Sequence, residues 1–237
     1  MAFRSATSPA GDAHRCSEKD YRMDFCAHLL DTVGPQWAAM LDHPFLRQTA
    51  DGSLPPGRFE TWLQQDYVFV REELRVIGGL IAKAPPQLQR LLGGFIPGLA
   101  GELDMFEAAA ADRRISLDNI EPNPVCHAYM MFLQATVHSR DFAESFAVLY
   151  GVERAYYDSW SRVKQRQDHA SPYQSFIDHW SGQAFGAGLR EVEGCLDQLA
   201  AECGAAERAR MEDLFRLTVR YEYLFWDMAL NGADWPV

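Results

Sequence analysis

The stretch Gly151-Val-Glu-Arg-Ala-Tyr-Tyr-Asp-Ser-Trp160 has the spacing of an α-helix with a mostly aromatic face. Three aromatic side chains recur there at intervals of three and four residues from Glu153. They are Tyr156, Tyr157 and Trp160. If this face is buried, Glu153 is an interior acid that needs a partner or a ligand. The alternative is that Glu153 lies at the edge of the face and pairs with Arg154 or Arg162.

Helical periodicity extends from this stretch over almost the whole chain. No segment shows sustained two-residue alternation bounded by turns, which strands would require. The sequence therefore predicts an all-α protein, a single-domain bundle of about seven to nine helices. The expected helices span about 21–41 with a break at 34–35, 57–83, 87–110, 124–139, 142 to beyond 160, 171–203 with a bend near 181, and 205–231.

Several short motifs mark where the expected helices begin and end. Asn123 precedes Pro124 as an N-cap precedes a first helical residue. The segment Asp141-Phe-Ala-Glu144 resembles a capping box, and Gly232 is a natural C-cap. His43, which precedes a proline, is expected in a turn or cap rather than as a metal ligand.

The composition excludes some classes of protein. The chain has 237 residues, is 48% hydrophobic and carries a formal net charge of −11. No block of Lys and Arg offers a surface for nucleic-acid phosphates, and no apolar run reaches the roughly 18–20 residues of a membrane span. The first residues lack the apolar core of a secretory signal. We expect a cytoplasmic protein with a disordered tail at 1–19 and one helical domain at 20–237.

Cysteines and histidines give little support for a metal or a disulfide framework. The five cysteines are scattered, and no Cys-x-x-Cys pair occurs, which is typical of reduced thiols. A ferritin-like di-iron site needs Glu-x-x-His pairs, and the candidate histidines have no glutamate three residues earlier. These histidines are His127, His138, His169 and His179. We therefore expect no metal and no cofactor.

Two further acids share the aromatic setting of Glu153. Asp66 lies within one turn of Trp62 and Phe69, and Glu222 precedes Phe225 by three residues. Each acid taken alone is more often a cap or an ion pair. Acids from different helices of a bundle can, however, converge on one pocket, where burial raises their pKa values. Such a pocket suits a flat, nitrogen-rich heterocycle that rings stack on and acids hydrogen-bond.

Five motifs, taken in order, point to a known family. They are His43-Pro44-Phe45, Asp51-Gly-Ser-Leu-Pro55, Arg58-Phe59, Gln65-Asp66-Tyr67 and Tyr221-Glu-Tyr-Leu-Phe-Trp-Asp-Met228. Together they resemble the TenA/THI-4 family over about residues 25–235. The resemblance implies a heme-oxygenase-like bundle without heme, and a pocket for the thiamin pyrimidine. It also implies thiaminase II or aminopyrimidine aminohydrolase activity in thiamin salvage, and a homo-oligomer, a dimer or a tetramer.

The resemblance assigns substrate-binding roles to individual positions. Asp66 matches the family's pyrimidine-binding aspartate, and Glu222 matches the glutamate of the terminal motif. Tyr129 and Tyr156 match two pocket tyrosines. Three further positions are aromatic in the family, two of them with tyrosine in its best-known branch. Those positions are Phe69, Trp180 and Phe225.

One departure concerns the catalytic group. The best-known branch has a nucleophilic cysteine four residues before the central tyrosine, where this chain has Val152. The next residue, Glu153, matches the glutamate of a cysteine-lacking branch, which implies action on aminopyrimidine or N-formyl-aminopyrimidine. Glu153 and Glu222 are the expected catalytic residues of a metal-independent hydrolase. A non-catalytic aminopyrimidine-binding protein and a heme-oxygenase-like di-iron oxidase remain as alternatives.

Overall fold

The protein is described by a computed structural model that covers residues 24–236 of the 237. The disordered tail predicted at 1–19, and the domain boundary after it, lie outside the described residues. Every regular element between residues 24 and 236 is an α-helix, which confirms the all-α prediction.

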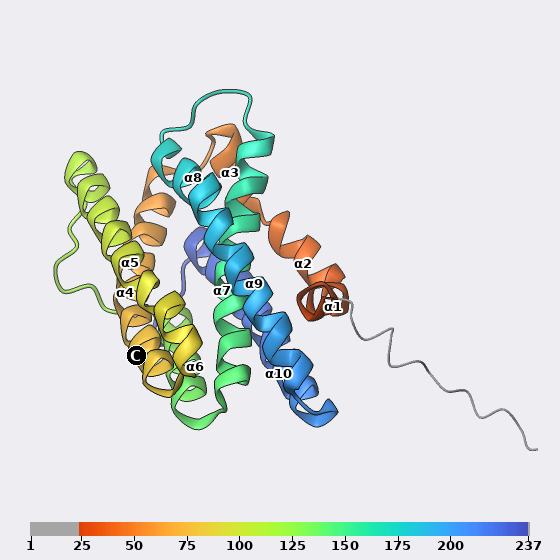
Figure 1. Ribbon diagram of the computed structural model, residues 1–237. Helices are drawn as coiled ribbons and strands as arrows, with labels where there is room; N and C mark the ends of the chain where they lie inside the picture. Colours follow the sequence, from red (N-terminus) through yellow and green to blue (C-terminus); the bar gives the residue numbers. More distant parts are fainter. Residues whose placement is uncertain (1–23, 237) are drawn as a thin grey trace, which may run out of the picture.

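Ten helices follow one another through the described part of the chain, packed side by side as a bundle (Figure 1). The prediction of seven to nine helices was too low, because two segments each contribute one more helix than expected. The helices are α1 (Phe25–Thr32), α2 (Gly34–Leu41), α3 (Pro44–Asp51), α4 (Pro56–Lys83), α5 (Pro86–Arg113), α6 (Pro124–Ser139), α7 (Phe142–Arg166), α8 (Gln174–Trp180), α9 (Gln183–Glu202) and α10 (Ala205–Asn231).

The extra helices have local causes. The imidazole of His43 accepts a hydrogen bond at Nδ1 from the backbone N–H of Phe45, 3.2 Å away, and so caps α3 where only a turn was expected. The prediction of His43 as a cap residue is confirmed. At Gly182, an added Cβ would lie 2.7 Å from the backbone oxygen of Asp178. This tight turn separates α8 from α9, where the sequence indicated a single bent helix.

Two other caps were predicted, and they have different outcomes. The Asn123 side chain accepts hydrogen bonds from two backbone N–H groups at the start of α6, as predicted. The capping box predicted at Asp141 is wrong, because the Asp141 side chain makes no cap hydrogen bond. Its intended partner, Glu144, is 2% exposed and instead forms an ion pair with Arg210 of α10. Glu144 therefore ties two helices together rather than closing the end of one.

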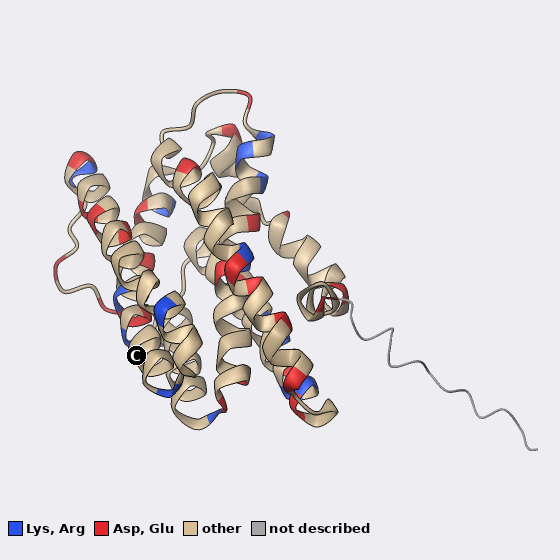
Figure 2. Cartoon of the chain, in the orientation of Figure 1, with Lys and Arg blue, Asp and Glu red and all other residues tan. Residues whose placement is uncertain are grey.

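Helix α7 is the axis of the bundle. All its residues from 143 to 152 are buried, so this half of the helix is covered on every side. It packs against α10, α9, α8 and α3, while α5 and α6 lie against α4 (Figure 1). Acidic and basic residues are scattered over the helices, and no basic stripe is seen in the view of Figure 2. Side chains that α7 directs inward therefore meet several helices at once.

Gly151 permits the close approach of α7 and α10. A Cβ added there would lie 2.9 Å from Cγ2 of Thr218 and 3.3 Å from Cδ2 of Phe215. We expect Gly151→Ala to lower the free energy of unfolding by about 1–3 kcal/mol, since the extra methyl group must push two packed helices apart. Urea unfolding followed by circular dichroism measures the change. As a control, Gly194→Ala on α9 has open space and should be neutral or stabilising. Equal stability of the two variants would contradict the close-packing account.

Candidate functional site

Asp66 of α4 is a fully buried carboxyl group in which only one of the two oxygens accepts a hydrogen bond from a described residue. Its exposed fraction is 0%. The hydroxyl of Tyr156, from α7, donates to its Oδ1 at 2.5 Å. Its other oxygen, Oδ2, is buried and has no hydrogen-bond partner among the described residues. A buried oxygen without a partner costs free energy, so this atom is a candidate contact for a ligand.

Glu222 of α10 repeats the arrangement. It is also 0% exposed, and the hydroxyl of Tyr129, from α6, donates to its Oε1 at 2.5 Å. Its Oε2 is buried without a partner in the described part of the chain. Two carboxyl–tyrosine pairs from four different helices thus each leave one oxygen for a bound molecule.

Aromatic rings surround both pairs. The ring of Phe69 lies 4.9 Å from that of Tyr129 and 5.5 Å from that of Phe225, measured between centroids. The ring of Tyr156 meets that of Trp180 edge to face at 5.3 Å. All five predicted aromatic residues are buried. Packed rings of this kind hold their orientation and offer flat faces to a heterocycle.

A small cavity lies where these helices meet. Its volume is about 20 Å³, room for about one water molecule. Five of the eight predicted site residues line it, namely Asp66, Phe69, Glu153, Tyr156 and Trp180. The other three, Tyr129, Glu222 and Phe225, are not part of its wall. The rings of Tyr129 and Phe225 pack against that of Phe69, and Glu222 bonds to Tyr129. Side chains must therefore move before a bound ring can reach both carboxyl–tyrosine pairs.

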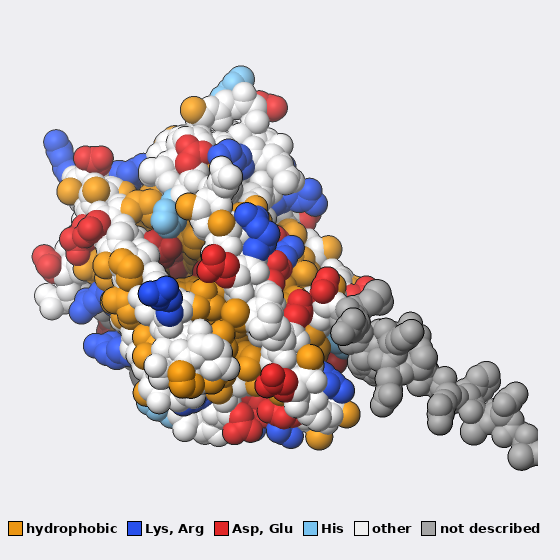
Figure 3. Space-filling model, viewed as in Figure 1, with side chains coloured by type: hydrophobic (Ala, Val, Ile, Leu, Met, Phe, Trp, Pro, Cys, Tyr) orange, Lys and Arg blue, Asp and Glu red, His pale blue; other side chains and the backbone are white. Residues whose placement is uncertain are grey.

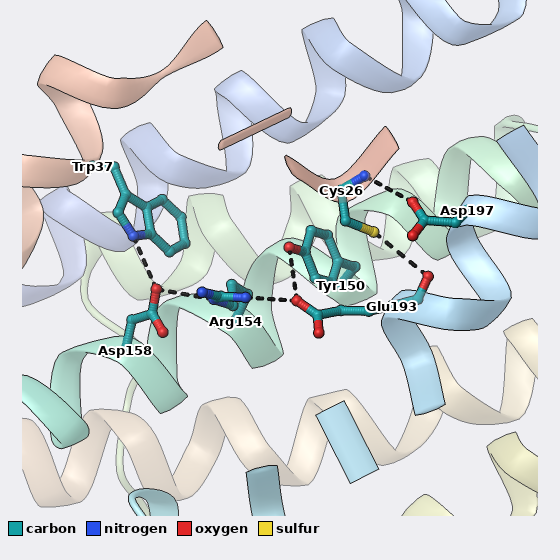
Figure 4. A network of polar contacts seen from close by, with 7 residues as sticks. All are labelled: Cys26, Trp37, Tyr150, Arg154, Asp158, Glu193 and Asp197. Atoms are coloured by element: carbon teal, nitrogen blue, oxygen red, sulfur yellow. Dashed lines mark hydrogen bonds and ion pairs between the residues drawn. The ribbon is translucent and has the colours of Figure 1, made fainter. Parts of the chain in front are cut away.

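Glu153 forms no ion pair with any described residue. It is half-buried and lines the cavity. Arg154, the partner considered above, turns to the other side of α7, where its Nε lies 2.9 Å from Asp158 and its Nη1 lies 2.6 Å from Glu193 (Figure 4). Arg162, the second alternative, is exposed. The interpretation of Glu153 as half of an arginine ion pair is therefore wrong.

The network around Arg154 is structural. It joins α7 to α9 through Glu193, and to α2 through Asp158, which accepts a hydrogen bond from Trp37 at 3.1 Å (Figure 4). The backbone N–H of Cys26 adds α1 by donating to Asp197 of α9 at 2.9 Å. These contacts hold the outer side of α7 in place and thereby fix the position of the side chains that α7 directs toward the cavity.

Two acids of the cavity wall were missed by the sequence analysis. Glu73 of α4 is 5% exposed, and Glu102 of α5 is 7% exposed. The position of Glu73, seven residues after Asp66, places it on the same helix face and could have revealed it. Glu102 accepts a hydrogen bond from Nε1 of Trp180 at 3.2 Å and lies 2.9 Å from Nε2 of His179. No local pattern of the sequence indicates that contact.

The cavity wall contains acids but no Lys, Arg or His. Burial raises the pKa values of Asp66, Glu153 and Glu222 well above their ordinary values, and repulsion from neighbouring carboxyl groups adds to the effect. Burial and the same repulsion raise the pKa of Glu73 to about 8. These carboxyl groups therefore hold their protons more strongly than exposed carboxyl groups do, and a carboxyl group that keeps its proton can act as a general acid.

A groove of about 610 Å³ leads from the surface to the cavity. It lies between α5 and α9, where hydrophobic side chains gather in Figure 3. Four residues line both the groove and the cavity, namely Leu99, Glu102, Glu153 and Phe185. Glu153 therefore lies at the junction of the two spaces.

The sequence profile of the TENA/THI-4/PQQC family matches residues 30–232. The chain belongs to this family. A relative from Halalkalibacterium halodurans, named aminopyrimidine aminohydrolase, is 27% identical over 90% of this chain and 98% of its own length. A solved TenA homologue from Pyrococcus furiosus is 36% identical, with a TM-score of 0.85 over 86% of this chain and 99% of that one.

The heme-oxygenase-like fold is also confirmed. A solved domain from Shewanella denitrificans, described as having this fold, is 17% identical and superposes with a TM-score of 0.64. The superposition covers 88% of this chain and 96% of that domain. At this level of identity, the likeness establishes the fold alone.

In this TenA-family chain, no cysteine among residues 24–236 lines the cavity. Val152, at the position that the family resemblance assigned to a nucleophilic cysteine in the best-known branch, is 5% exposed and lines the cavity beside Glu153. The thiol of Cys126 lies 3.5 Å from the backbone oxygen of Gln65, and burial raises its pKa. A protonated, buried thiol is a poor nucleophile. Carboxyl groups therefore line the cavity where a thiol was considered, namely those of Asp66, Glu73, Glu102 and Glu153.

Between residues 24 and 236, no group of three or more His, Cys, Asp and Glu is arranged to hold a metal ion. Within the same range, no helix is both long and apolar enough to cross a membrane.

Proposed function

We propose that this TenA-family protein is a metal-independent hydrolase of thiamin salvage that acts on an aminomethylpyrimidine or its N-formyl derivative. The observation that carries the proposal is the pair of buried carboxyl–tyrosine contacts, each with a free oxygen, beside the unpaired Glu153. The names of aminopyrimidine aminohydrolase relatives support the same activity and agree with the sequence analysis.

The two free carboxyl oxygens suit an aminopyrimidine ring. A protonated carboxyl group donates to a ring nitrogen, while an ionised one accepts from the exocyclic amino group. We assign the first role, the protonated donor, to Glu222 and the second, the ionised acceptor, to Asp66. Tyr129 and Tyr156 hold the two carboxyl groups in place, and the neighbouring rings stack on the pyrimidine. Those neighbouring rings are Phe69, Trp180 and Phe225.

Glu153 supplies the base for hydrolysis. As the oxygen of a water molecule attacks the carbon bonded to the leaving nitrogen, the Glu153 carboxylate accepts the water proton. The bond between carbon and nitrogen then breaks, and the nitrogen takes up a proton. A carboxylate whose pKa is raised by burial is a stronger base than an exposed one, which suits this task. Glu222, which hydrogen-bonds the ring, assists by stabilising the charge that develops on the pyrimidine.

Val152 and Glu153 together support placement in the cysteine-lacking, glutamate-type branch of the family. Such a protein lacks a thiolate at the cavity and would cleave thiamin itself poorly, because a carboxylate is the weaker nucleophile. The proposed partners are the pyrimidine substrate and further copies of this chain, as a dimer or a tetramer, in the cytoplasm.

Turnover of three compounds tests the proposed function. Purified protein treated with a chelator is incubated with the aminomethylpyrimidine, its N-formyl derivative and thiamin, and the products are separated by mass spectrometry. The expected result is hydrolysis of at least one of the first two and little cleavage of thiamin. Binding without turnover of any compound would favour a non-catalytic aminopyrimidine-binding protein instead.

The groove between α5 and α9 is the proposed route of the substrate to the cavity. Gly188 lines it, and a Cβ added there meets nothing within 4 Å. We expect Gly188→Phe to fill part of the groove without disturbing the fold and to lower kcat/KM at least roughly tenfold, as obstructed access slows productive binding.

The matched control for the groove is Gly194→Phe on the same helix. Gly194 also has open space around it but does not line the groove. Steady-state kinetics of the two variants on the same substrate provide the comparison. Equal kcat/KM values for Gly188→Phe and the wild type would show that substrate enters elsewhere.

A further inference from the structure

Glu73 is a buried carboxyl group that no contact in the fold explains. It is 5% exposed, and it forms no hydrogen bond or ion pair with a residue between 24 and 236. It lies on the face of α4 that also carries Asp66 and Phe69, and it lines the cavity. A buried acid without a partner destabilises the folded protein, so its position calls for a role outside the packing of the helices.

Acids from three other helices and from its own helix face Glu73, while α6 contributes the hydroxyl groups of Tyr129 and Thr136. Glu102 approaches from α5, Glu153 from α7 and Glu222 from α10, while Asp66 lies on its own helix. Glu73 also lines a second cavity of about 10 Å³ beside α6 and α7, whose wall has no Lys, Arg or His. Carboxyl groups that share such a space cannot all be ionised at once. Some of them therefore keep a proton while a neighbour is ionised.

The other acids already have partners. Asp66 and Glu222 each accept a hydrogen bond from a tyrosine, and Glu102 accepts one from Trp180. Only Glu73 and Glu153, among these five acids, lack a hydrogen bond to a described residue. Both line the same cavity wall, on α4 and α7. This leaves them free to handle the two protons that hydrolysis moves.

We propose that Glu73 is the general acid of the reaction, which protonates the leaving nitrogen while Glu153 accepts the proton of water. This inference rests on the proposed function. The new bond joins the water oxygen to the attacked carbon, and the bond from that carbon to nitrogen breaks. The water proton goes to Glu153, and the Glu73 proton goes to the amine. Proton transfer from Glu153 back to Glu73 then restores the starting state, with one water consumed and no other reactant needed.

The test compares Glu73→Gln with the control Glu72→Gln. Glutamine keeps the shape of the side chain but cannot donate an acidic proton. Glu72 lies on another side of α4 and bonds to Arg75 and Gln134, so its variant should keep wild-type activity. We expect Glu73→Gln to lower kcat for the N-formyl compound about a hundredfold with little change in KM. Affinity for hydroxymethylpyrimidine, measured by calorimetry, reports whether the cavity is intact.

A second substrate separates acid catalysis from a structural role. In the formate ester of hydroxymethylpyrimidine, the leaving oxygen needs protonation far less than an amine nitrogen does. The loss caused by Glu73→Gln should therefore shrink to less than about tenfold with the ester. If Glu73→Gln folds poorly, Glu73→Met, which is similar in volume, takes its place. Wild-type kcat in the variant, or equal losses with both substrates, would overturn the role of Glu73. Failure of the wild type to hydrolyse both the N-formyl compound and the aminomethylpyrimidine would instead overturn the proposed function.

Discussion

Glu153→Gln is expected to lower kcat for the N-formyl-aminopyrimidine by about a thousandfold, within the range that loss of a general base produces. Glutamine preserves the size of the side chain but cannot accept the water proton. No described residue forms an ion pair with Glu153, so the substitution breaks no bridge and should not unfold the protein. Affinity for hydroxymethylpyrimidine should stay within about threefold of the wild-type value, because Glu153 is not one of the groups that hydrogen-bond the ring.

The control for this variant is Glu60→Gln, at an exposed position of α4. Single-turnover kinetics measure the chemical step, and calorimetry measures affinity. A Glu153→Gln enzyme with a rate within threefold of the control would show that another group activates the water. The same rates measured after thiol alkylation would reveal whether a cysteine takes part.

Asp66→Asn is expected to weaken the binding of hydroxymethylpyrimidine about a hundredfold. The Asp66 carboxyl group accepts from Tyr156 and leaves Oδ2 for the ligand. The asparagine side chain replaces one of the two oxygens with a nitrogen, which cannot accept a hydrogen bond. Either the tyrosine hydroxyl or the ligand therefore loses its hydrogen bond, and the group left without a partner is buried. Hydrogen bonds to charged groups contribute about 1.5–3 kcal/mol, which corresponds to roughly tenfold to 150-fold in affinity.

Tyr156→Phe provides a graded comparison for this prediction. It removes the hydroxyl that orients Asp66 but leaves the carboxyl group, so its loss of affinity should be smaller, about fivefold. Isothermal titration calorimetry of both variants gives the two dissociation constants. Unchanged affinity in Asp66→Asn would mean that the ring binds away from Asp66, for example in the groove between α5 and α9.

The fold was predictable where the sequence carries local signals. The final helix was expected at 205–231 and is found at Ala205–Asn231, because Gly232 adopts a positive φ of 86° that favours glycine. The capping box at Asp141 failed because Glu144 has a partner, Arg210, that lies 66 residues away in sequence. Local chemistry thus located helix ends well, except where a contact between distant helices competes for the same side chain.

The candidate site was predictable only where local sequence patterns carry the signal. Aromatic neighbours at helical spacing identified Asp66, Glu153 and Glu222 as inward-facing acids. The tyrosine contacts of Asp66 and Glu222 join residues that are 90 and 93 positions apart, so no local pattern contains them. Glu73 was missed because the run Arg71-Glu-Glu-Leu-Arg75 has the composition of a solvated helix face.

A crystal structure with bound hydroxymethylpyrimidine tests the central claim most directly. We predict that the ring lies inside the cavity, hydrogen-bonded to Oδ2 of Asp66 and Oε2 of Glu222, with its methylene carbon facing Glu153. Small movements of Phe69 and Phe185 should accompany binding, since the cavity holds only about 20 Å³ without a ligand. A ring bound in the groove alone, or one whose methylene carbon points away from Glu153, would contradict the account.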